Sequence, residues 1–103
     1  MTANNTHNLL KEFQNVLKYY LDKTERVMNL YQDTAETQYF LFALKGTMSF
    51  IQNKEKVDVL SLKKSIDGLI AGQKGRNGND RLSDLRNELE EELAILKLRY
   101  DLI

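Results

Sequence analysis

The stretch QYFLFALKGTMSFIQ, residues 38–52, is the most apolar part of the chain. If it is helical, its apolar residues fall on one stripe at three- and four-residue spacing, and such a stripe is typical of a buried face. The stripe consists of Phe40, Leu41, Leu44, Met48 and Ile51, and aromatic residues at Tyr39, Phe42 and Phe50 lie on its flanks. A helix that is apolar over so much of its circumference belongs between other helices. Its neighbours are therefore predicted to be amphipathic helices.

Three further segments carry apolar residues at helical spacing, with charged residues on the other side. Together with the central stretch they predict helices over residues 6–31, 34–52, 58–71 and 80–101. The most regular stripe belongs to the last segment and is formed by Leu82, Leu85, Leu89, Leu93, Leu96, Tyr100 and Ile103. The chain has no proline and no alternating strand pattern, so long uninterrupted helices are favoured.

Polar residues and glycines indicate where these helices begin and end. Asp58 precedes an apolar stripe and is a predicted N-cap, because its carboxylate accepts a hydrogen bond from a free amide of the first turn. Asp33 or Thr34 is predicted to cap the central helix, with Glu36 completing a near capping box. Gly72 is suited to the left-handed conformation that ends many helices, so we expect the third helix to stop there.

One hydrophobic core is expected, because 103 residues are enough for a single small domain. We predict an all-α antiparallel four-helix bundle that comprises residues 1–103. The predicted core residues are Phe13, Leu17, Leu44, Met48, Ile51, Ile66, Leu85, Leu89 and Leu93.

Composition argues against several classes of function. Lys and Arg number 15, as do Asp and Glu, so no net positive charge attracts nucleic acid or an anionic membrane. The absence of cysteine and the single histidine leave no thiolate nucleophile and no ordinary zinc site. No segment approaches the roughly 18 apolar residues of a membrane span, and the first residues do not resemble a signal peptide. We therefore expect a cytoplasmic protein without a metal, a cofactor or a nucleic-acid partner.

The sequence offers no set of catalytic groups. His7 has no acidic or nucleophilic residue at helical spacing around it, so no triad is formed. The acidic run ELEEE, residues 88–92, lacks the histidine that follows the glutamates of di-iron bundles, and a solvent-exposed helix face is the better interpretation. The glycine-rich run GQKGRNGN, residues 72–79, connects two helices and does not match a phosphate-binding P-loop. A non-enzymatic role in protein binding is therefore predicted.

Lys45 and Gly46 interrupt the most hydrophobic helix, and two accounts of them are open. In the first, Gly46 permits close approach of another helix, and Lys45 extends its charged end to water. In that case Phe42 and Gly46 are buried. In the second, the two residues belong to an exposed binding surface, and Phe42 is accessible one turn away.

The second account follows from a resemblance to a known family. The segment FALKGTMSF, residues 42–50, resembles the signature helix of histidine phosphotransfer domains, in which a phosphoaccepting histidine is followed by x-Leu-Lys-Gly. The resemblance implies that Lys45 balances phosphoryl charge and that Gly46 leaves room for a response regulator. Two positions depart from the pattern, because Phe42 replaces the histidine and Gln52 stands where the family usually has a glycine. The resemblance therefore implies a degenerate bundle that binds a receiver-like partner without relaying phosphate.

A second class of function involves the end of the chain. Small helical proteins of this kind also resemble bacteriocin immunity proteins and the helical partners of secreted toxins. The ending LKLRYDLI, residues 96–103, is loosely similar to the aromatic, basic end of some immunity proteins. A second apolar line near this end is formed by Ile95, Leu98 and Leu102. Together with the aromatic flanks of residues 38–52, it predicts a homodimer or a partner-bound surface. The expected partner-binding residues are Phe42, Lys45, Gly46, Ile95, Leu98 and Leu102.

Overall fold

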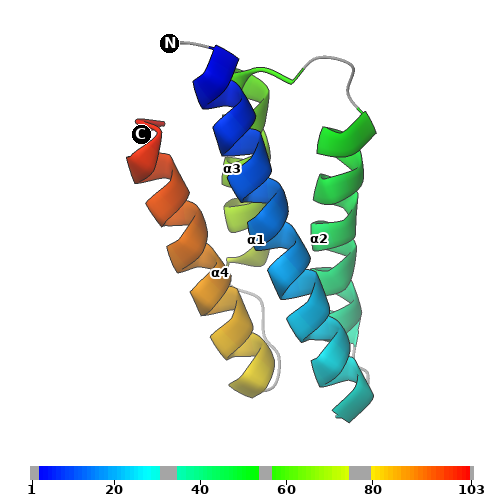
Figure 1. Ribbon diagram of the computed structural model, residues 1–103. Coiled ribbons are helices and arrows are strands. Elements are labelled where there is room, and N and C mark those ends of the chain that lie inside the picture. The colour runs from blue at the N-terminus through cyan, green and yellow to red at the C-terminus, as the bar shows by residue number, and fades with distance from the viewer. Residues whose placement is uncertain (1–2, 31–34, 54–56, 75–79, 103) are drawn as a thin grey trace.

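The computed structural model describes residues 3–30, 35–53, 57–74 and 80–102. The four helices are α1 (Ala3–Leu30), α2 (Ala35–Asn53), α3 (Val59–Gln73) and α4 (Asp80–Arg99). The described residues contain no strand. In Figure 1 each helix runs in the direction opposite to the helix before it. The predicted all-α fold of four helices is confirmed.

The predicted helix boundaries agree with the observed ones to within a few residues. Asp58 is the N-cap of α3, and its carboxylate accepts a hydrogen bond of 2.7 Å from the backbone amide of Ser61. The predicted stop at Gly72 is wrong, because α3 continues to Gln73 and its C-cap is Lys74, in an extended conformation. The predicted caps Asp33 and Thr34 lie outside the described residues.

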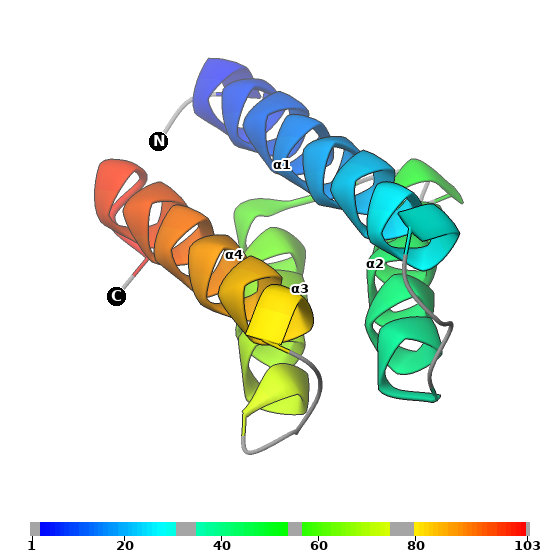
Figure 2. The ribbon, with the colours of Figure 1, turned by 90° about the horizontal axis from the view of Figure 1, so that it is seen from below.

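The longest helix, α1, organises the packing. Its 28 residues follow the long dimension of a molecule that measures 45 × 25 × 17 Å. It packs against α2 and α4 (Figure 2). Helix α3 lies across the bundle from α1 and also packs against α2 and α4. Consequently α2 and α4 lie on opposite sides of the bundle, and a surface on one of them is remote from a surface on the other.

The apolar stripes of the four helices meet in a hydrophobic core. Eight of the nine predicted core residues are buried, as expected from their spacing: Phe13, Leu17, Leu44, Ile51, Ile66, Leu85, Leu89 and Leu93. The ninth, Met48, is only partly buried and packs against the edge of the core. By spacing Met48 continues the buried stripe of α2 between Leu44 and Ile51, but its side chain is covered only in part.

Charged and polar side chains link α4 to its two neighbours. Lys97 donates a hydrogen bond of 2.6 Å to Asp67 of α3, and Lys63 donates one of 3.2 Å to the same carboxylate. These bonds hold the pKa of Asp67 below its ordinary value, the bond from Lys97 having the largest effect. On the α1 side, the carboxylate of Glu12 accepts from Arg99 and Tyr100. The C-terminal turn of α4 is therefore tied to both neighbouring helices.

The chain turns inward after α4, which corrects the prediction for Leu102. This residue was expected on an exposed apolar line, but it is buried in the core with 5% of its surface exposed. The turn is a Schellman motif, because the amide of Leu102 donates to the carbonyl of Lys97 and that of Asp101 to the carbonyl of Leu98. Asp101 takes the left-handed position with φ of 56°, and this reverses the chain so that Leu102 covers the end of the core.

We expect Asp101→Gly to raise the free energy of unfolding by up to about 1 kcal/mol. A left-handed conformation costs an L-residue roughly 1–2 kcal/mol, and glycine avoids this cost although it loses more conformational entropy on folding. The matched variant Asp101→Val should lower stability, because a β-branched residue adopts positive φ poorly. Urea unfolding of the three proteins tests the motif. A valine variant as stable as the glycine variant would contradict it.

Candidate functional site

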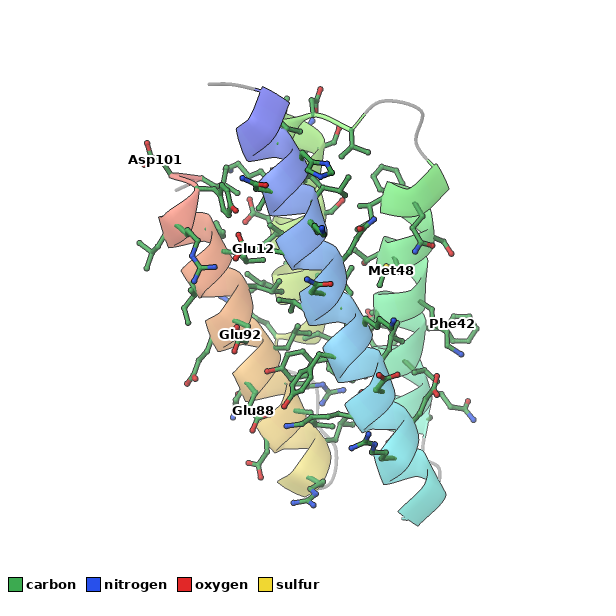
Figure 3. All side chains as sticks on the ribbon, in the orientation of Figure 1. Glu12, Phe42, Met48, Glu88, Glu92 and Asp101 are labelled. Carbon is green, nitrogen blue, oxygen red and sulfur yellow. The ribbon has the colours of Figure 1, made fainter. Side chains whose placement is uncertain are left out.

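Phe42, Lys45 and Gly46 form one exposed surface on α2, called here the α2 face. Phe42 is 75% exposed, which is the largest exposure of any large hydrophobic residue among those described. Its ring points away from the bundle, whereas Met48 on the same helix is turned toward the other helices (Figure 3). Lys45 and Gly46 follow one turn later and are also exposed. The three residues expected to act together are therefore neighbours in the structure.

The fold does not require a glycine at position 46. A Cβ atom built on Gly46 meets no other atom within 4 Å, so no helix approaches it closely. The packing account, in which Phe42 and Gly46 are buried against another helix, is wrong. The same holds for Gly68 of α3, where a Cβ atom also meets nothing within 4 Å. Since glycine costs about 1 kcal/mol relative to alanine inside a helix, both positions carry a cost that the packing does not explain.

A groove between α2 and α3 adjoins the α2 face, and the sequence-based prediction missed it. Its volume is about 580 Å³, and its floor is made largely of small side chains from both helices. From α2 it is lined by Ala43, Gly46 and Thr47, and from α3 by Ser61, Ser65, Gly68 and Gly72. Tyr39 and Phe50 form aromatic walls, and Lys64 is the charged side chain of the lining. The recurrence of small residues at helical spacing was a signal that could have revealed this groove.

Charge on the α2 face comes from Lys45. It forms no ion pair or hydrogen bond with any residue that the structure describes. Lys64 in the adjoining groove is likewise without an ionic partner in the described ranges. A long exposed side chain with a free cation is able to meet a carboxylate or phosphate group of a partner at little desolvation cost. The α2 face therefore combines the exposed aromatic ring of Phe42 with the positive charge of Lys45.

The other predicted partner-binding residues lie elsewhere. Ile95 and Leu98 project from α4 with 46% and 68% of their surfaces exposed. They lie on the opposite side of the bundle from α2, so they do not extend the α2 face (Figure 2). Leu102, assigned to the same line, is buried and belongs to neither surface. Five of the six predicted partner-binding residues therefore lie on two separate surfaces, one on α2 and one on α4. The sixth, Leu102, lies on neither.

The described residues contain no cluster of side chains suited to binding a metal ion. No group of three or more His, Asp or Glu residues within the described ranges is placed to hold a metal ion. Glu88 and Glu92 lie on the exposed side of α4, as predicted (Figure 3). Burial, followed by the negative charges of Glu88 and Glu92, raises the pKa of nearby Tyr20 to about 12. Its phenol therefore stays protonated at neutral pH.

No helix within the described ranges has both the length and the apolar character that crossing a membrane demands. Comparisons with protein-family models, with curated proteins and with solved structures gave no match to this chain.

Proposed function

We propose that the chain is a non-enzymatic protein-interaction domain that uses the α2 face to bind a receiver-like partner without relaying phosphate. The observation that carries the proposal is the position of Phe42, three-quarters exposed on the side of α2 opposite the core. Burying a phenylalanine side chain is worth about 1.5–3 kcal/mol, so a partner that covers it gains affinity. Exposed aromatic residues grouped on one helix are typical of interaction surfaces.

The chemistry of position 42 supports binding and not phosphoryl transfer. A phosphoacceptor needs a nucleophilic nitrogen or oxygen, and the phenylalanine ring has neither. The family resemblance implies a lysine that balances phosphoryl charge and a glycine that leaves room for the partner. Lys45 is a free cation and Gly46 leaves open space, so both residues fit these roles. The cytoplasm is the compartment that we propose, because receiver-like proteins act there.

The proposal predicts that two α2 variants lose the partner while the bundle stays folded. We expect Phe42→Ser to weaken binding at least tenfold through the loss of buried apolar surface. Gly46→Leu should block docking because its side chain fills the open space. Since the new atoms meet nothing in the bundle, its free energy of unfolding should not fall. Isothermal titration against purified receiver domains from the same organism measures the affinities, and urea unfolding measures the stabilities.

The matched control is Leu98→Ser, which removes a similarly exposed apolar side chain from the remote helix α4. It should leave receiver binding unchanged. The proposal fails if no receiver domain binds the wild-type chain, or if Phe42→Ser binds as well as the control. A strong loss of stability in Gly46→Leu would restore the packing account.

The exposed pair on α4 favours a second candidate, in which the chain is an immunity protein or the helical partner of a toxin. Ile95 and Leu98 lie on the last helix, where that class carries its specificity. In this case Leu98→Glu, and not Phe42→Ser, should abolish binding of the partner. Comparing Phe42→Ser with Leu98→Glu therefore separates the two candidates.

A further inference from the structure

We propose that a second copy of the chain docks on α2, so that the two α2 helices cross in antiparallel orientation at Gly46. The proposal starts from a ridge of residues on the outer side of this helix. Phe42, Gly46 and Phe50 are spaced by four residues and therefore lie in one row along the helix surface. Phe42 is 75% exposed and Phe50 49% exposed. The row thus presents two aromatic side chains with a gap midway between them.

The gap is open to an approaching backbone. A Cβ atom at Gly46 would meet nothing within 4 Å, so packing within the bundle does not require the glycine. Glycine on an exposed helix face removes the side chain that would otherwise keep another helix at a distance. The exposed glycine therefore suits a close contact with a chain outside the bundle.

The spacing identifies the occupant as a second copy. A two-fold axis through Gly46 exchanges the position four residues before it with the position four residues after it. Phe42 of one chain then lies against Phe50 of the other, and the same contact forms a second time. The surface is therefore its own complement, as an interface with two-fold symmetry requires.

Charge and area are consistent with a weak dimer. The ridge itself contains no charged residue, so the contact buries no ion. Lys45 lies on its flank and is exposed, where salt screens the repulsion between the two copies. Given their exposed fractions, Phe42, Phe50 and Tyr39 offer roughly 300 Å² of aromatic surface per chain. Stable dimers bury about 800 Å² per partner, so we expect a dissociation constant well above nanomolar.

This inference stands independently of the proposed receiver-like partner, although both use Phe42 and Gly46. If both are correct, the second copy and the partner compete for the α2 face. Failure to dimerise leaves receiver binding intact, and failure to bind a receiver leaves the dimer intact. The two are measured by different experiments.

The absence of cysteine from the sequence permits a direct test. Gly46→Cys places one thiol at the proposed two-fold axis, where the two copies come close enough for a disulfide. In a glutathione redox buffer, we expect the disulfide-linked dimer of Gly46→Cys to form at least tenfold faster than those of two controls. Ser49→Cys places the thiol on the same helix away from the axis, and Ala94→Cys places it on exposed α4. Equal rates for the three variants would overturn the proposal.

Sedimentation equilibrium of the cysteine-free protein provides the second measurement. Between about 10 μM and 1 mM the wild-type chain should pass from monomer toward dimer. Phe42→Ser should weaken the dimer at least tenfold, and Gly46→Leu should abolish it, while circular dichroism shows an unchanged helical content. Leu98→Ser should have no effect. A wild-type protein that remains monomeric up to 1 mM, or a dimer lost only in Leu98→Ser, would refute an α2 interface.

Discussion

Leu89→Ala should lower the free energy of unfolding by about 2–5 kcal/mol. Leu89 lies on the inner side of α4 with 2% of its surface exposed, within the core formed by all four helices. The substitution removes buried apolar atoms and leaves a cavity that the surrounding helices fill only in part. Leu89 also borders a partly open surface pocket of about 210 Å³ between α3 and α4.

Urea unfolding followed by the helical signal in circular dichroism measures this loss. The control is Leu98→Ala, which makes the same chemical change nine residues further along α4 at a position that is 68% exposed. Its effect should stay within about 0.5 kcal/mol, as is usual for surface positions. A loss below about 1 kcal/mol for Leu89→Ala would show that the inner side of α4 does not pack as described.

Glu36→Ala should destabilise the protein by about 1.5–3 kcal/mol, because it removes a charged hydrogen-bond partner of a buried cation. The cation is Arg86 of α4, which is only 6% exposed. Its Nη2 atom donates to Glu36 at 2.9 Å, and its Nε atom donates to Gln73 at 3.0 Å. The guanidinium carbon also lies 6.0 Å from the ring centroid of Phe40. One side chain of α4 is thereby joined to α2 and α3.

A double variant separates the loss of the ion pair from the loss of packing. In Glu36→Leu/Arg86→Met both charges are replaced by apolar groups of similar length, and such replacements of buried pairs are often neutral or stabilising. We expect the double variant to recover most of the stability that Glu36→Ala loses. The interpretation fails if Glu36→Ala costs less than about 1 kcal/mol, or if the double variant is as unstable as the single one.

The sequence by itself determined the number, type and approximate bounds of the helices. Local signals were sufficient for this, because apolar residues at three- and four-residue spacing define one buried side of each helix. Eight of nine predicted core residues followed from the same spacing, and Asp58 was identified as a cap from its position before a stripe. On α2, Phe42 was placed one turn from Lys45 and Gly46 by helix geometry alone.

Other features were decided only by the tertiary structure. The sequence left open whether Gly46 is buried, since a glycine is suited both to close helix packing and to an open surface. The structure shows that the space beside Gly46 is empty. Leu102 continued an apolar line in the sequence, but the turn at Asp101 directs it into the core. Helical spacing does not show how the chain continues after a helix ends.

The burial of Arg86 is likewise a feature that local spacing in the sequence does not predict. Glu36 was assigned to a cap because capping depends on near neighbours, whereas its ion pair joins residues 50 positions apart. Arg86 lies between Leu82 and Leu89 on the inner side of α4, where its spacing matches the apolar stripe but its charge argues for solvent. A buried cation becomes acceptable only when a carboxylate from another helix lies within reach. Local spacing therefore determines which side of a helix is buried, and the packing of distant segments determines which polar groups accompany it.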